Sequence, residues 1–158
     1  MIVLRRLARG VWSHAGSRFT EWLGAVPLLG MGYVLYAQPE ALSSTPSFIT
    51  LAAWASAAVW SNAVMLCGIG RLGALAVNGT FRSFPYSPVI RFFASAFAAM
   101  FWMLFTVGVF DAWRNFGGSP TGVVAYGTLI LLELRNAYVS RVDMAATRGR
   151  AAHAGLDG

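Results

Sequence analysis

The sequence predicts an all-α integral membrane protein, a four-helix bundle with an N-terminal amphipathic helix at the membrane interface. Its 158 residues are 57% hydrophobic and only 11% charged, whereas soluble domains carry about 25% charged residues. No charged residue stands between Glu40 and Arg71, and nineteen uncharged residues separate Arg91 from Asp111. Uncharged runs of this length match the ~20 residues that a helix needs to cross a bilayer. We therefore expect residues 1–158 to form a single membrane domain.

The amphipathic helix is expected over residues 1–20. Apolar residues recur there at the three-to-four spacing of one helical face, at Leu4, Leu7, Val11, Ala15 and Phe19. Basic residues fill other positions and would face anionic lipid headgroups: Arg5, Arg6, Arg9 and Arg18. The alternative is a basic N-terminal segment without regular structure.

The first span is expected at about residues 20–37, where Pro27 removes one internal hydrogen bond. A cleaved signal peptide is the competing interpretation of this apolar stretch. Two features oppose it, because Arg5 and Arg6 stand far from the stretch and Leu35 occupies a position where a small residue is preferred. We therefore expect a retained span.

The three later spans each begin with a hydroxyl residue followed by proline. A hydroxyl suits the N-cap, and proline suits the first helical position because its missing N–H is not needed there. The pairs are Thr45–Pro46, Ser87–Pro88 and Ser119–Pro120. They predict spans at about residues 46–70, 88–110 and 120–140, the first continuing toward the Asn78–Gly79 pair. Residues 141–158 are then a polar cytoplasmic tail.

The distribution of arginine predicts the orientation of the spans. Four arginines precede the first span, none lies in residues 38–45, and three lie from Arg71 to Arg91. One follows at Arg114, and four stand from Arg135 onward. This alternation follows the positive-inside rule, with both termini in the cytoplasm. It also accounts for the formal charge of +6 without nucleic-acid binding, since no basic face is interleaved with exposed aromatic residues.

Aromatic and small residues within the spans predict how the helices are placed. Four aromatic residues fall near the predicted interfaces, as in the aromatic belts of membrane proteins: Trp22, Tyr36, Trp113 and Tyr138. Trp102 falls mid-span and is expected to pack against a neighbouring helix. Small residues four positions apart allow helices to approach closely, as at Ala53 with Ala57 and Ala94 with Ala98.

No motif in the sequence predicts a catalytic, cofactor or metal site. Cys67 is the single cysteine and lies in an apolar run, which suits a buried packing residue. The two histidines, His14 and His153, stand near opposite termini, too few for a structural zinc site without carboxylates. Gly68, Gly70 and Gly73 match a G-x-G-x-x-G pattern, but dinucleotide binding needs that turn between a strand and a helix. Close helix packing or local bending of a helix is the better explanation of these glycines.

Glu133 is the most specific candidate for an intramembrane polar site. It belongs to a stripe at three-to-four spacing that should face the bundle interior: Gly122, Tyr126, Leu129, Glu133, Asn136, Ser140 and Asp143. A buried carboxylate must be protonated or paired. From the rise along each helix we expect Arg91 as first partner and Arg71 as second. The alternative is that the last span sits lower, so that Glu133 meets headgroups and water.

Three short segments resemble small multi-span membrane proteins of tailed bacteriophages and prophages: Arg71–Gly79, Pro88–Arg91 and Glu133–Asp143. The resemblance implies a phage origin and a location in the inner (cytoplasmic) membrane of the bacterial host. It carries over no catalytic residue.

The leading functional hypothesis is a non-enzymatic, holin-like lysis factor, suggested by small size, several spans and the arginine-bearing tail from Arg141 to Arg150. A superinfection-exclusion or adaptor protein that binds another membrane component is the alternative. A small transporter is the third hypothesis, suggested by Glu133. The expected partners are the lipid bilayer and either a second copy or another membrane protein, with no nucleic acid and no cofactor.

Overall fold

The computed structural model describes residues 18–80 and 86–154, which form helices joined by short connections. No strand occurs in these two ranges. The expected amphipathic helix over residues 1–20 lies outside the described residues, apart from its last three positions. Arg5, Arg6 and Arg9 lie outside them as well. Arg18 immediately precedes α2 (Phe19–Ala37), so the end of the predicted interfacial helix belongs to the first long helix.

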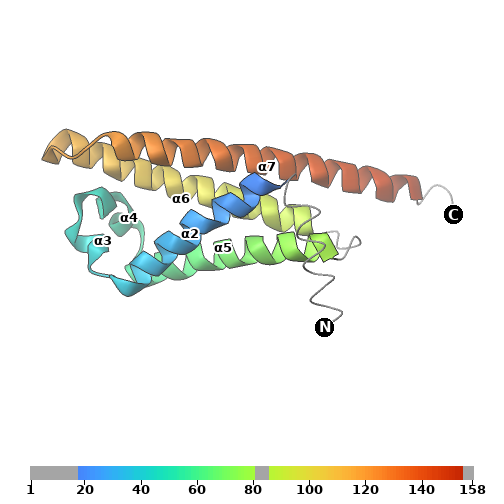
Figure 1. The fold of residues 1–158 in the computed structure, drawn as a ribbon, viewed down its shortest axis with the longest axis horizontal. Helices are drawn as coiled ribbons and strands as arrows, with labels where there is room; N and C mark the ends of the chain where they lie inside the picture. Colours follow the sequence, from blue (N-terminus) through green and yellow to red (C-terminus); the bar gives the residue numbers. More distant parts are fainter. Residues whose placement is uncertain (1–17, 81–85, 155–158) are drawn as a thin grey trace.

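Four long helices run in alternating directions (Figure 1): α2, α5 (Ala57–Thr80), α6 (Ser87–Phe116) and α7 (Thr121–Ala154). The α6 and α7 helices lie side by side, and α2 packs mainly on α5. The start of α2 and the end of α7 lie at the same end of the bundle, and α7 extends beyond the end of α5. We call this end, where α2 and α6 begin, the basic end.

Three short helices connect α2 to α5 at the opposite end of the bundle: α3 (Ala41–Ser44), η1 (Pro46–Phe48) and α4 (Ile49–Trp54). The predicted continuous helix over residues 46–70 is therefore wrong. Thr45 is extended and Pro46 begins η1 as expected, but the backbone turns extended again at Ala55 and α5 begins at Ala57. Ala53 and Ala57 consequently lie on different helices and share no helical face.

Tertiary contacts explain this break in the helix. The Trp60 indole Nε1–H of α5 donates a hydrogen bond of 2.8 Å to the Leu51 carbonyl oxygen, which folds α4 back toward α5. The Phe48 ring stacks on Phe105 of α6, with ring centroids 4.9 Å apart. The Ser56 hydroxyl accepts the Val59 N–H at 3.4 Å, which satisfies a backbone donor in the first turn of α5.

The other helix boundaries follow the predicted signals in part. Ser119 behaves as expected, since its hydroxyl accepts the Thr121 N–H at 3.3 Å at the start of α7. Ser87 does not cap α6, because its hydroxyl instead donates to the Ala74 carbonyl of α5 at 3.1 Å. The α6 helix runs past residue 110 to Phe116, where Gly117 adopts the left-handed conformation (φ 71°) that ends many helices.

The predicted polar tail over residues 141–158 is helical through Ala154, so α7 continues far beyond the expected end at residue 140. The α5 helix runs through Gly70 to Thr80, close to the predicted end at Asn78–Gly79. Gly68 packs against α2, where an added Cβ would lie 2.9 Å from a Leu29 methyl carbon. The G-x-G-x-x-G pattern is thus part of a continuous helix. Its first glycine serves close helix packing, but that explanation is wrong for Gly70 and Gly73, where an added Cβ would meet nothing within 4 Å.

Aromatic residues form the core at the end opposite the basic end. The Trp102 side chain is 1% exposed and stacks on Tyr126 of α7, with centroids 5.7 Å apart and planes within 9°. Phe105 packs edge-on against the same Tyr126 ring, with ring centroids 4.4 Å apart. Phe101 packs against Trp60 of α5, with ring centroids 5.6 Å apart. Trp102 therefore packs against a neighbouring helix, as expected.

Among the helices of residues 18–80 and 86–154, two are long and apolar enough to cross a membrane: α5 over Ala57–Val77 and α6 over its whole length. Buried helices of soluble proteins meet the same two criteria.

Trp102→Ala should destabilise the protein strongly, because it removes the largest buried side chain from the contact between α6 and α7. We expect a loss of about 3–5 kcal/mol in the free energy of unfolding. The matched control is Trp54→Ala, since the Trp54 side chain is 69% exposed. Thermal unfolding of the purified variants in one detergent compares them, and equal melting temperatures would contradict this description of the core.

Candidate functional site

Charged side chains from all four long helices meet inside the bundle near its basic end. They are Glu21 of α2, Arg71 of α5, Arg91 of α6 and Glu133 of α7, each no more than 1% exposed. Arg18 and Asp143 join them from the edge of the cluster. We call these six residues the ion-pair network. Its three arginines and three carboxylates balance in formal charge.

Arg71 and Glu133 form one of the two separate groups of ion pairs in the network. The Arg71 Nη1 donates to Glu133 Oε1 at 2.7 Å, and Nη2 donates to Oε2 at 2.5 Å. This two-pronged geometry matches the planar guanidinium to the carboxylate. Arg71 Nη2 also donates to the Ser95 hydroxyl of α6 at 2.7 Å. One guanidinium therefore ties α5 to both α6 and α7.

The first-choice partner for Glu133, Arg91, is wrong, and the second choice, Arg71, is its partner in the structure. Ser95 is the α6 residue that shares the Arg71 guanidinium with Glu133. Arg91 precedes it by one helical turn, about 6 Å nearer the basic end. The alternative in which Glu133 meets headgroups and water is also wrong, since its side chain is 1% exposed.

Arg91 forms the second group with two carboxylates. Its Nε and Nη2 atoms both donate to the Glu21 carboxylate of α2 at 2.5 Å. Its Nη1 donates to Asp143 Oδ2 of α7 at 3.0 Å. Arg18 donates to the same Asp143 oxygen at 2.8 Å and lies 3.4 Å from Glu21. Arg18, expected to face lipid headgroups, is therefore part of the ion-pair network.

Sequence reasoning missed Glu21 as a site residue, although a signal was present. Glu21 is the single charged residue of α2, and Arg71 is the single charged residue of α5. A lone charge within an apolar helix needs a partner on another helix when it is buried. Applied to both helices, that rule would have required a cation for Glu21 and a carboxylate for Arg71.

Asn136 anchors the start of α2 to α7. It is fully buried, its Oδ1 accepts the Thr20 hydroxyl at 2.9 Å, and its Nδ2 donates to the Thr20 carbonyl at 3.3 Å. The predicted stripe on α7 faces the bundle, since all seven members are buried or half-buried: Gly122, Tyr126, Leu129, Glu133, Asn136, Ser140 and Asp143. The face of α7 that was expected to point inward therefore does so.

Gly24 provides the space for the pair of Arg71 and Glu133. An added Cβ at this position of α2 would lie 2.6 Å from Glu133 Oε1 and 2.9 Å from Arg71 Nη1. Both distances are shorter than normal van der Waals contacts of a carbon atom. Because Gly24 has no side chain, the paired groups of Arg71 and Glu133 can lie directly against the backbone of α2.

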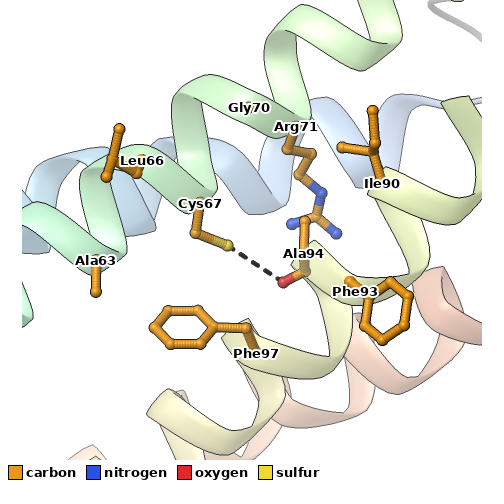
Figure 2. Close-up of a pocket in the computed structure, with 9 residues that line it drawn as sticks. All are labelled: Ala63, Leu66, Cys67, Gly70, Arg71, Ile90, Phe93, Ala94 and Phe97. Carbon is orange, nitrogen blue, oxygen red and sulfur yellow. Dashed lines mark hydrogen bonds between the residues drawn. The ribbon is translucent and has the colours of Figure 1, made fainter. Parts of the chain in front are cut away.

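An apolar pocket of about 430 Å³ lies between α5 and α6, with Arg71 among its lining residues (Figure 2). Apart from Arg71 and Cys67, the lining consists of apolar residues and glycine: Ala63, Leu66, Gly70, Ile90, Phe93, Ala94 and Phe97. The Cys67 thiol lies 3.3 Å from the Ala94 carbonyl oxygen and donates to it (Figure 2). Cys67 is half-buried and packs between the two helices.

The ion-pair network joins neighbouring helices through pairs of opposite charges. Each buried carboxylate is held by a guanidinium, and the described residues contain no group of three metal-binding side chains. Removing one partner of a buried pair leaves an uncompensated charge and costs about 3–5 kcal/mol. The arrangement therefore fixes which helices lie together. No protein-family model, curated protein or solved structure matches this chain.

A double-mutant cycle should assign Glu133 to Arg71. Glu133→Gln and Arg71→Gln should each lower the free energy of unfolding by about 3–5 kcal/mol. Their effects should be strongly non-additive, because the second substitution removes a charge that the first has already left unpaired. The control cycle pairs Glu133→Gln with Arg91→Gln and should be much closer to additive. Stronger coupling of Glu133 to Arg91 would contradict the geometry described above.

Gly24→Ala should weaken the bundle, because the new methyl group displaces the paired groups of Glu133 and Arg71. We expect a loss of about 1–3 kcal/mol, typical of overpacking. Gly30→Ala is the matched control on the same helix, since a Cβ there meets nothing within 4 Å. That control should raise stability by up to about 1 kcal/mol. Thermal unfolding would show opposite shifts, and equal shifts would argue against the close approach at Gly24.

Proposed function

We propose that the chain is a multi-pass protein of the bacterial inner membrane, in which α2, α5, α6 and α7 are the four spans. The length and apolar character of α5 and α6 support this proposal. The α2 helix has 19 residues, or about 28 Å at 1.5 Å per residue, which is close to the ~30 Å of a bilayer core. The start of α2 and the end of α7, which both lie at the basic end, then belong to the cytoplasmic side.

The outer surfaces of α2 and α7 support the same proposal. Their charged residues within residues 19–37 and 121–134 are Glu21 and Glu133, and both point inward to buried arginines. Their outward faces carry large apolar side chains instead, such as Val26 at 65%, Val124 at 73% and Leu131 at 69% exposure. Apolar faces of this kind are suited to lipid rather than to water.

The placement of the unburied charges supports the proposed orientation. Arg135, Arg141 and Arg148 follow one another on the part of α7 that runs toward the basic end. The other end carries Arg114 together with the exposed carboxylates Glu40 and Asp111. An excess of arginine on one side is the positive-inside pattern.

Within that membrane, we propose a non-enzymatic, holin-like role for a phage-encoded protein. One observation carries the proposal: the bundle is apolar outside and conceals a charged and polar stripe inside. In the closed form the network neutralises that stripe. If helices separate within an oligomer, the same side chains supply the polar lining that an aqueous opening requires. The ion-pair network then acts as the latch of the closed form.

An exclusion or adaptor protein is the second candidate, and complete pairing of the network favours it. All four buried charges of the network have partners, and the pocket beside Arg71 is apolar. Such a bundle needs no opening to bind another membrane component through its outer surface. The two candidates differ in what happens to the membrane potential of a cell that makes the protein.

Expression in a bacterial host from an inducible promoter separates the two candidates. The holin-like role predicts an abrupt loss of membrane potential, followed by arrest of growth. Glu133→Gln, which opens the latch, should shorten the delay before that loss at equal amounts of protein in the membrane fraction. Arg114→Gln, at the opposite end of the bundle, should leave the delay unchanged. Sustained potential and growth would reject the pore, and protection against related phages would then support exclusion.

A further inference from the structure

A second pocket lies between the start of α6 and the far part of α7. It has a volume of about 360 Å³ and is lined by Phe92, Arg141, Met144, Ala145 and Arg148. Arg141, Met144, Ala145 and Arg148 follow the three-to-four spacing of a single face of α7, and Phe92 comes from α6. The pocket thus combines two cationic side chains with an apolar wall.

The two arginines of this pocket differ from those of the ion-pair network. Arg141 and Arg148 are exposed, and neither takes part in an ion pair among the residues that the structure describes. The nearest carboxylate along α7, Asp143, is already held by Arg18 and Arg91. Two uncompensated positive charges, about 10 Å apart along the helix axis, therefore face one pocket.

The level of the pocket suits a ligand at the membrane surface. Phe92 directly follows Arg91, which pairs with Asp143 of α7, and α6 begins at Ser87. Under the proposed function this is the inner interface of the bilayer. Phe92 and Met144 can there contact the upper part of an acyl chain, while Arg141 and Arg148 reach the headgroup region by extending their side chains.

We propose that this pocket binds an anionic phospholipid, with its phosphate held by Arg141 and Arg148 and its acyl chain against Phe92 and Met144. Basic pockets between membrane helices on the cytoplasmic side recognise anionic headgroups by charge complementarity. A zwitterionic lipid brings its own cation and neutralises the site less well. The inference rests on the proposed membrane location, but it is independent of the choice between a lysis factor and an adaptor.

The test uses the full-length chain, purified in a nonionic detergent and titrated with phosphatidylglycerol while bound lipid is counted by native mass spectrometry. The wild type should bind phosphatidylglycerol in preference to phosphatidylcholine. Each arginine near a charged interface contributes about fivefold in affinity, so Arg141→Gln with Arg148→Gln should weaken binding about 25-fold. Arg114→Gln removes the same charge at the other end and should bind as the wild type does.

Three results would overturn the lipid site: equal affinity for the two lipids, unchanged affinity in the double variant, or displacement of phosphatidylglycerol by millimolar inorganic phosphate. The single variants Arg141→Gln and Arg148→Gln, with melting temperatures measured in parallel, separate loss of binding from loss of folding. Alkaline carbonate extraction of cell membranes tests the membrane location separately. A chain that resists extraction but shows no lipid preference refutes the pocket alone, whereas an extracted chain refutes the location.

Discussion

The structure depends on the requirement that a charge removed from water must be paired. Arg71, Arg91, Glu21 and Glu133 are almost completely buried, each on a different helix. Desolvation of such groups offsets most of their Coulomb attraction, so a complete pair adds little net stability. A mismatched arrangement, however, would leave a bare charge inside and be strongly disfavoured. The network therefore determines which arrangement of helices forms, and it contributes little to the net stability of that arrangement.

The rest of the bundle accommodates these pairs. Gly24 leaves the space in which the Arg71 and Glu133 groups meet, and the Ser95 hydroxyl accepts a further hydrogen bond from Nη2 of Arg71. Asn136 holds the start of α2 against α7 through Thr20, which keeps Glu21 near Arg91. The aromatic contacts of Trp102 with Tyr126 fix α6 against α7 at the other end. Ion pairs thus hold α6 near α7 at the basic end, and aromatic packing holds the same two helices together at the other end.

Local patterns in the sequence predicted the helical class and the inward face of α7, because both follow from the period of a single helix. The partner of Glu133 could not be predicted in the same way, because the rise along each helix does not give the register between helices. Counting residues from Pro88 and Pro120 placed Arg91 too close to Glu133. The break at Ala55 was missed for a related reason. It depends on contacts of Trp60 and Phe48 with distant residues, while Ala53 to Ala57 contains no helix-breaking residue.

The order of the pairs along the chain has a consequence for biosynthesis. Glu21 pairs with Arg91, 70 residues later, and Arg71 pairs with Glu133, 62 residues later. Each early helix thus emerges from the ribosome with a charge whose counterpart has not yet been made. A nascent chain that ends after α6 still carries Arg71 without its carboxylate. Glu21 gains its partner when α6 is made, whereas Arg71 must wait for α7, so the ion pairs are complete only once the last helix has been synthesised.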